Sequence, residues 1–135
     1  MPFFGAVIYA KQLALVTRFY ERVLGFDVRH RADDHIVLGS AGFELVVVEI
    51  PAHIPVVIES PPVRREATPI KLIFVVPSIA ESRTAVAEAG GVLDPVEREW
   101  QSADSRVCDG LDPEGNVFQL RQQAGSSRIS PTLTS

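Results

Sequence analysis

The first fifty residues combine short apolar runs with one helical repeat. Residues 3–10 have the composition of a strand. The apolar positions that follow recur every three or four residues, at Leu13, Val16, Tyr20 and Leu24. This spacing predicts a helix, and Gly25 is a plausible left-handed stop. Three short apolar runs separated by turn-prone residues come next, at 26–28, 35–38 and 43–49. The pattern predicts a β-α-β-β-β unit.

A proline-rich segment separates this unit from a second one with the same pattern. Five prolines fall between residues 51 and 69, which is typical of an extended, exposed connection. Residues 70–76 then have the β-branched and aromatic content of a strand. Ser78 and Glu81 form a capping-box signature for a helix that ends at Gly90. Strand-like runs follow at 92–96, 104–108 and 116–121.

The spacing of equivalent positions indicates an internal duplication. Gly25 and Gly90, which end the two predicted helices, are 65 residues apart, whereas Phe43 and Phe118 in the two last strands are 75 apart. The second copy therefore has hairpins about ten residues longer. We predict one domain over 1–123, with module one at 3–50, a linker at 51–69 and module two at 70–123. Residues 124–135 lack apolar periodicity, so we expect a flexible tail.

Composition narrows the class of protein and its partners. With 135 residues and 46% hydrophobic residues, the chain can close one core. The net charge of -4 is scattered, and the basic residues form no cluster beyond Arg64 and Arg65, so we expect neither nucleic acid nor membrane as a partner. A single cysteine, Cys108, and an N-terminus without signal-peptide features favour the cytoplasm.

Two motifs in the duplicated unit are similar to those of a known superfamily. Phe19-Tyr20 followed by Leu24-Gly25-Phe26 resembles its FY…LGF signature, and the DPEGN turn at 112–116 resembles its DP(D/E)GN turn. In this order they resemble the vicinal oxygen chelate superfamily of glyoxalase I, bleomycin-resistance proteins and extradiol dioxygenases. The resemblance spans about residues 3–123. It implies an α+β fold of two tandem βαβββ modules with curved mixed sheets around a cavity.

Alternation along each strand predicts which side chains face that cavity. If Phe43, Leu45 and Val47 meet the helix, Glu44 faces the cavity. The same parity in the duplicate strand places Gln119 and Arg121 inside. In the two first strands, the inward set is taken as Gly5, Val7 and Tyr9, and as Lys71, Ile73 and Val75.

The resemblance also implies where a divalent ion would be held. Metal-dependent members use one residue from the first and last strands of each module, and these positions are Gly5, Glu44, Lys71 and Gln119. Glycine has no side-chain donor and an ammonium has no lone pair, so we expect a degenerate metal site and no cofactor. Our hypothesis is that Lys71 pairs with Glu44 in place of the ion, because an unpaired buried carboxylate is costly. The pair either grips a ligand or is structural.

Other conspicuous residues have both functional and structural interpretations. Tyr9 offers a hydroxyl or a stacking face to a ligand, or it packs the cavity wall. Trp100 falls where many relatives carry an aromatic at the cavity mouth, or it anchors an exposed loop. His30 and His35 are candidate general bases, although exposure or hydrogen bonding is the default for histidine. Cys108 is predicted to be a small core residue.

These observations predict a homodimer that binds a small organic ligand, of the bleomycin-resistance type. The predicted ligand-binding residues are Tyr9, Glu44, Lys71, Trp100, Gln119 and Arg121. The alternative is an enzyme, a lyase or isomerase of the glyoxalase type in which Glu44 acts as general base. A domain that only mediates protein contacts is a third interpretation. The ligand cannot be read from the sequence, and pairing of modules within the chain or across a dimer stays open.

Overall fold

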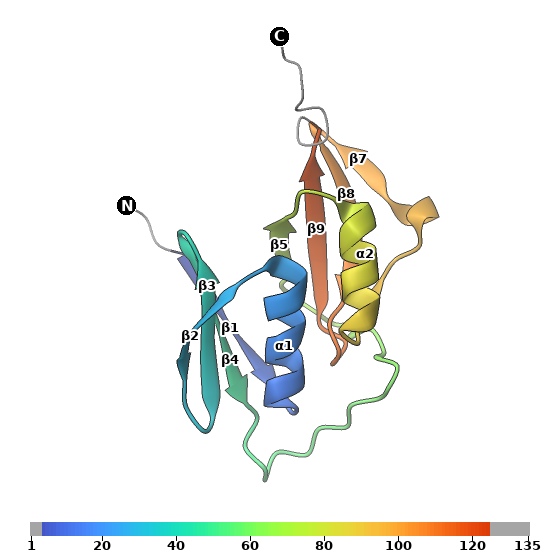
Figure 1. Cartoon of the computed structure of the whole chain (residues 1–135). Coiled ribbons are helices and arrows are strands. Elements are labelled where there is room, and N and C mark those ends of the chain that lie inside the picture. Colours follow the sequence, from blue (N-terminus) through green and yellow to red (C-terminus); the bar gives the residue numbers. More distant parts are fainter. Residues whose placement is uncertain (1–3, 125–135) are drawn as a thin grey trace.

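The first module forms a four-stranded sheet with one helix (Figure 1). In this computed structural model, which describes residues 4–124, the strand order of the sheet is β1-β4-β3-β2. Strand β1 is parallel to β4, and the other neighbours are antiparallel. We call this sheet A. Its elements are β1 (Phe4–Ala10), α1 (Leu13–Leu24), β2 (Asp27–Arg31), β3 (His35–Ser40) and β4 (Phe43–Glu49).

The second module repeats this arrangement as sheet B, in the order β5-β9-β8-β6. Strand β5 is parallel to β9, as β1 is to β4. A short 3-10 helix η1 and a strand β7, which pairs with β8, are inserted where the second copy is longer. The elements are β5 (Leu72–Val75), α2 (Ile79–Glu88), β6 (Val92–Leu93), η1 (Val96–Arg98), β7 (Trp100–Ser102), β8 (Ser105–Leu111) and β9 (Val117–Gln123). The predicted tandem βαβββ architecture is confirmed.

The helices begin and end at the residues that the sequence singled out. Gly25 follows α1 with φ 70°, a conformation that glycine adopts without steric cost. The Ser78 side chain accepts a hydrogen bond from the Glu81 backbone N–H at the start of α2. Gly90, just after α2, has φ 94°. Local chemistry therefore sets the lengths of both helices. The predicted tail at 124–135 lies outside the described residues, apart from Ala124.

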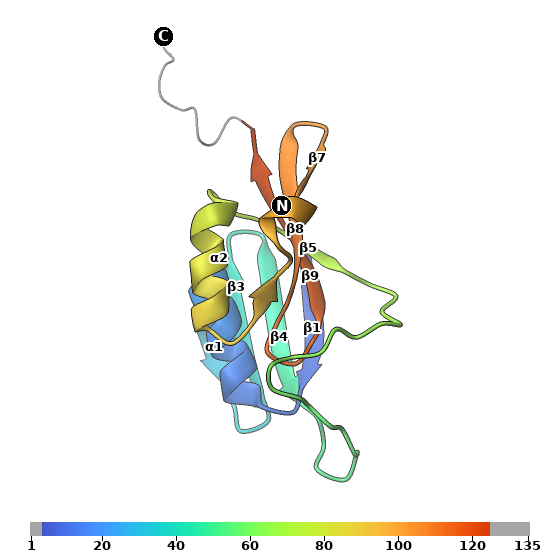
Figure 2. The ribbon, with the colours of Figure 1, turned by 90° about the vertical axis from the view of Figure 1, so that its right-hand side faces the viewer.

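The two modules share one hydrophobic core, and α1 lies at its centre. The Phe19 ring is 5.7 Å from the ring of Phe118 on sheet B, and the Tyr20 ring is 6.0 Å from that of Phe74. Leu45 of sheet A and Leu120 of sheet B are both fully buried in the same cluster. Both sheets thus turn their helix-side faces inward. Their other faces, called here the outer faces, lie on the outside of the chain (Figures 1 and 2).

The DPEGN turn ties module two to α1 through a buried carboxylate. Asp112 is fully buried and accepts a hydrogen bond from the Tyr20 hydroxyl at 2.9 Å. It also accepts from the backbone N–H groups of Glu114 and Asn116, at 2.8 and 3.0 Å. Burial raises the pKa of Asp112, against the lowering effect of these hydrogen bonds, and burial followed by the Asp112 charge raises the pKa of Tyr20. The two motifs that suggested the family are therefore in direct contact.

The same turn caps the start of α1. The Glu114 carboxylate accepts hydrogen bonds from the backbone N–H groups of Lys11 and Gln12, at 2.9 and 2.6 Å. Gln12, the residue before the helix, makes no side-chain cap of its own. Lys11 and Gln12 directly precede α1, so the carboxylate satisfies two N–H groups where the chain enters the helix and places a negative charge at the positive end of the helix dipole. Module two thus completes a helix of module one.

The linker is attached to both modules. Lys11 Nζ donates to the Val56 carbonyl at 2.8 Å, and Arg64 pairs with Asp94 at 2.7 Å. Arg65 Nε donates to the Glu114 carbonyl at 3.2 Å. The last of these contacts holds the linker against the DPEGN turn. Between residues 4 and 124, none of the helices has the length and apolar character needed to span a membrane.

Candidate functional site

Burial and strand register reproduce the alternation predicted for the last strand of each module. In β4, Leu45 and Val47 are fully buried toward the helix, and Glu44 lies on the outer face. In β9, Phe118 and Leu120 are buried against the core, whereas Gln119 and Arg121 lie on the outer face. The polar residues that the sequence proposed as ligand contacts therefore stand on the outer faces of the two sheets.

On sheet A, Glu44 is flanked by glycine on both neighbouring strands. Its register partners are Gly5 on β1 and Gly39 on β3. A Cβ added at Gly39 would lie 3.3 Å from Arg29 Cζ, so the guanidinium covers this glycine. Arg29 sits at a register shift in β2, between Val28 and His30, where simple alternation fails. The sequence pattern predicted this strand only over 26–28, so Arg29 was not among the candidate residues.

On sheet B, a chain of polar contacts links four side chains. Lys71 Nζ lies 2.9 Å from Asp109 Oδ2. Gln119 Nε2 donates to Asp109 Oδ1 at 3.2 Å, and Arg121 Nε donates to Gln119 Oε1 at 2.8 Å. Gln119 is only 5% exposed and the Asp109 side chain 16% exposed, so this network is partly desolvated. It orders the four side chains on one face.

The prediction that Lys71 pairs with Glu44 is wrong for a single copy of the chain. Lys71 is bonded to Asp109, and Glu44 belongs to the other sheet. Sequence reasoning missed Asp109 because it ended that strand at residue 108, whereas β8 continues to Leu111. The signal was present, since Asp109 has the same strand parity as Val107, and its register partner is Gln119.

Trp100 lies on the same face of sheet B as Arg121. It is in β7, a strand that the sequence pattern did not predict, and its register partner on β8 is Val107, which in turn is opposite Arg121 on β9. Side chains of register partners point to the same side of a sheet. The indole is 41% exposed. The indole and the guanidinium therefore share this face, two strands apart with Val107 between them.

The six predicted ligand-binding residues form two groups in the chain. Tyr9 and Glu44 are on sheet A, and the other four belong to module two, where Lys71 directly precedes β5 and the rest are on sheet B: Lys71, Trp100, Gln119 and Arg121. The aromatic core around α1 separates the sheets, and their outer faces point away from each other. A single copy of the chain therefore does not bring the two groups together. Their roles in binding stay predictions.

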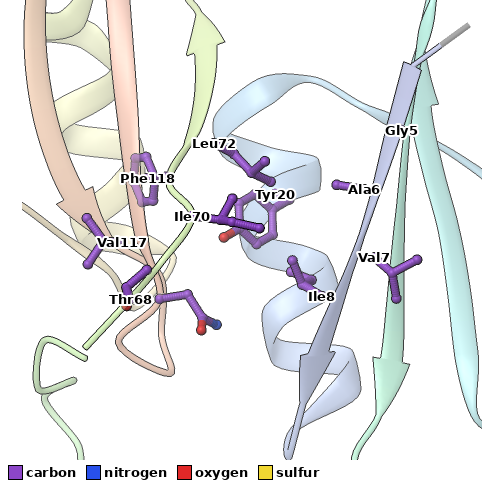
Figure 3. A pocket seen from close by; sticks show the side chains of 11 residues that line it. Gly5, Ala6, Val7, Ile8, Tyr20, Thr68, Ile70, Leu72, Val117 and Phe118 are labelled. Atoms are coloured by element: carbon purple, nitrogen blue, oxygen red, sulfur yellow. The ribbon is translucent and has the colours of Figure 1, made fainter. Parts of the chain in front are cut away.

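An apolar groove lies between the inner edges of the two sheets (Figure 3). Its volume is about 400 Å³, and α1 forms its floor through Tyr20. Val7 on one side and Val117 on the other mark its rims in Figure 3. Further lining residues come from β1, the linker end and β5: Ala6, Ile8, Ile70 and Leu72. None of the six predicted ligand contacts lines this groove.

His30 and His35 lie on the paired strands β2 and β3 of sheet A. His35 Nδ1 is 2.8 Å from Asp34 Oδ1, and the rings of His30 and His35 are 5.7 Å apart. The hydrogen bond with His35 lowers the pKa of Asp34, which is exposed. This arrangement matches the default interpretation, exposure with hydrogen bonding, rather than a general base in a cavity. In residues 4–124, no three His, Cys, Asp or Glu side chains are grouped to hold a metal ion.

Cys108 is a core residue, as predicted. It is fully buried, and its Sγ lies 3.7 Å from Arg83 Nη2. Burial raises the pKa of this thiol despite the neighbouring guanidinium. Burial also opposes ionisation of Glu99, but hydrogen bonds from Arg106 and Arg83 hold the pKa of Glu99 below its usual range. These contacts tie the β7 hairpin to α2 on the side away from the outer face.

Two βαβββ modules on a common core define the class of this protein, and the sequence comparison gives the family. The chain belongs to the family of the Glyoxalase-like domain, whose model matches residues 5–121. No curated protein sequence matches the chain.

Solved structures share the fold at low sequence identity. A glyoxalase/bleomycin resistance protein/dioxygenase family enzyme from Burkholderia phytofirmans PsJN matches with TM-score 0.68 and 17% identity, over 88% of this chain and 96% of that chain. The fosfomycin resistance protein FosX from Listeria monocytogenes matches with TM-score 0.66 and 16% identity, over 93% of each chain. A mutant of the same protein, complexed with Mn(II) and 1S,2S-dihydroxypropylphosphonic acid, matches with TM-score 0.62 and 14% identity, over 93% of this chain and 92% of that chain.

Proposed function

We propose that this protein binds a small organic molecule in a cavity made by sheet A of one copy and sheet B of a second copy. The observation that carries the proposal is the division of polar residues between two outer faces that point away from each other in one chain. Each face is a half-site, with a few polar groups among apolar strand residues. Ligand pockets commonly have this mixture. Pairing two copies supplies both halves to each cavity.

Two unpaired strand edges support this dimer. Strand β1 is hydrogen-bonded only to β4, and β5 only to β9, so the inner edge of each sheet is free within residues 4–124. Free apolar edges favour association with another chain. A twofold axis would place β1 of one copy beside β5 of the other. The exposed apolar side chains on and next to these strands are Phe4, Val7, Tyr9, Ile70, Ile73 and Val75.

Binding in this cavity needs no divalent ion. Of the four positions at which metal-dependent relatives carry ligands, Gly5 has no donor atom and Lys71 presents an ammonium that is already bound to Asp109. Only Glu44 and Gln119 can coordinate, and Gln119 is engaged with Asp109 and Arg121. These residues do not fit a divalent cation. We therefore infer a degenerate metal site and a ligand held by side chains.

A substitution on the β1 edge tests the dimer. Val7 is more than half exposed on the outer face of β1, and Val7→Asp would place a charge in the proposed contact. Burying an unpaired carboxylate is costly, so dimerisation should weaken at least about 100-fold. Sedimentation velocity over a concentration series measures this. The control is Val57→Asp, an exposed linker position that should leave the dimer unchanged.

A monomeric wild-type chain at all concentrations would rule out the composite cavity. So would equal behaviour of the two aspartate variants. A dimer that only Val7→Asp dissociates, together with ligand binding lost in the same variant, would support it.

The alternative function is catalysis by Glu44. The absence of side chains on the two residues beside it in the sheet supports this alternative. Both register partners of Glu44, Gly5 and Gly39, are glycines, so neither presents a side chain next to the carboxylate. A general base typically contributes about 10²- to 10⁴-fold to a rate. Glu44→Gln should remove that factor without weakening binding, if the protein is a lyase or isomerase of the glyoxalase type.

The test substrate is the hemithioacetal of methylglyoxal and glutathione, followed by absorbance, with Glu49→Gln at the exposed end of β4 as the control. Absence of turnover in the wild type argues for binding only. Stoichiometric zinc or nickel binding that Glu44→Gln abolishes would contradict the metal-free proposal.

The cytoplasmic location predicted from the sequence is part of this proposal. The only cysteine of the chain is buried in the core, and the fold needs no disulfide to close. This supports a reducing compartment, where thiols stay free.

A further inference from the structure

We propose that the end of the outer face of sheet B, where Arg121 meets the β7–β8 hairpin, binds the oxyanion group of an organic anion. This inference rests on the proposed ligand-binding function and adds the class of ligand, which is a carboxylate or phosphonate with a flat apolar body. The region is formed by β7, β8 and β9 of one chain (Figure 2). It can therefore be tested without the second copy.

The Arg121 guanidinium is oriented by one hydrogen bond and has further donors available. Its Nε donates to Gln119 Oε1, and Asp109 holds Gln119 in turn through its Nε2. This contact fixes the plane of the guanidinium while using one of its five N–H donors. Within residues 4–124, Arg121 forms no ion pair, and its two terminal nitrogens donate to no further partner. An ordered, unpaired fork of this kind matches the two oxygens of a carboxylate or phosphonate.

A polar recess lies beside the Arg121 guanidinium. A depression of about 600 Å³ is lined by Arg121 together with Ser102, Ser105 and Gln123. Ser102 pairs in register with Ser105, which pairs with Gln123, so the three side chains share the face of Arg121. They offer two hydroxyls and an amide as further donors to an oxyanion. The remaining lining residues are Ala103, Asp104 and Ala124.

The charges of Lys71 and Asp109 on this face compensate each other, and the charge of Arg121 remains. Asp109 is neutralised by Lys71 at 2.9 Å, which leaves the Arg121 charge uncompensated by that network. The carboxylate that lines the recess belongs to Asp104, an exposed residue of the β7–β8 turn. Asp104 is exposed, so solvent and salt screen its charge, whereas Arg121 is only partly exposed. The recess therefore favours an anion over a neutral molecule.

Apolar side chains on the same face can contact the body of the ligand that carries the anionic group. Trp100 occupies the same row of the sheet as Arg121, and Val75 of β5 is the register partner of Arg121 on its other side. The indole and the valine are both exposed. A flat apolar group extending from the anion would stack on the indole. The set thus selects aromatic or similarly flat anions.

Intrinsic fluorescence tests this directly, because Trp100 is the only tryptophan in the chain. Benzoate and phenylphosphonate are titrated as anionic probes, with benzamide as the neutral match of benzoate. We expect a saturable change with both anions and binding of benzamide at least about 10-fold weaker. Because a charge-assisted hydrogen bond is involved, Arg121→Gln should weaken anion binding about 10- to 100-fold. Arg121→Lys, which keeps the charge without the fork, should fall between.

Arg18→Gln is the matched control, since Arg18 is exposed on α1 and its loss changes the net charge equally. Equal affinity for benzoate and benzamide, or equal effects of the two glutamine variants, would overturn the anion site while leaving the composite cavity intact. No saturable response to either anion at millimolar concentration would also overturn it. Conversely, a monomeric Val7→Asp variant that still binds benzoate through Arg121 would support the anion site and reject the need for a dimer.

Discussion

Replacing Asp112 by alanine is expected to lower the free energy of unfolding by about 3–5 kcal/mol, the largest effect of any substitution considered for this fold. The carboxylate is fully buried and accepts hydrogen bonds from the Tyr20 hydroxyl and from two backbone N–H groups of its own turn. Alanine would leave these three donors, and the Asn116 Nδ2 amide as a fourth, without their acceptor, and buried unsatisfied donors are costly. Urea unfolding followed by circular dichroism measures the difference.

A double-mutant cycle separates the contact between the modules from the turn itself. Tyr20→Phe removes only the hydroxyl, and the coupling energy with Asp112→Ala should be about 1–3 kcal/mol. Asn116 Nδ2 also donates to Asp112, so Asn116→Ala serves as the comparison within the turn. A loss of less than about 1 kcal/mol in Asp112→Ala would mean that the turn does not hold the modules together.

Glu114→Ala is expected to cost about 2–4 kcal/mol, because module two then no longer caps the helix of module one. The residue is 3% exposed, and both carboxylate oxygens accept backbone N–H groups just before α1. Removal leaves those two donors unsatisfied in a part-buried setting. Thermal and urea unfolding both report the loss, and far-ultraviolet circular dichroism shows whether α1 frays.

The controls for this prediction are a conservative substitution and a local cap. Glu114→Gln keeps one carbonyl acceptor and loses the charge, so its effect should be intermediate. Ser78→Ala removes the cap of α2, which lies within its own module, and should cost about 1 kcal/mol. If Glu114→Ala costs no more than Ser78→Ala, capping across the modules adds nothing beyond an ordinary helix cap.

These two predictions give the family motifs a physical role in this chain. Tyr20 belongs to the FY…LGF motif and Asp112 to the DPEGN turn, and 92 residues separate them in sequence. Their hydrogen bond, with the Glu114 cap, fixes the second module against the first. The outer faces that carry the proposed ligand contacts are thereby held in a defined relation. Motifs outside the binding surface thus set its geometry.

Much of the architecture could be predicted because it follows from local chemistry. Helical spacing and the glycine at position 25 marked α1, and the serine at position 78 marked the start of α2. Alternation in β4 and β9 placed Glu44, Gln119 and Arg121 on the outer faces, because successive strand residues point to opposite sides. This alternation is a property of the chain and needs no knowledge of its neighbours.

Side-chain partners could not be predicted in the same way. Lys71 was expected to face Glu44, but its partner is Asp109, two strands away on the same sheet. That contact depends on the length of β8 and on how far a lysine reaches across β9. The strand that carries Arg29 was predicted only over 26–28 with no facing assigned, and the position of Arg29 depends on a register shift between β2 and β3. Both are consequences of pairing between strands.

The amino-acid sequence by itself determined the duplicated modules, the ends of their helices and the faces on which the residues of β4 and β9 stand, since these depend on propensity and period. Only the tertiary structure decided that the two sheets share one aromatic core around α1 and turn their outer faces away from each other. Packing between residues far apart in sequence, such as Phe19 and Phe118, sets that relation. No periodicity within one segment encodes it.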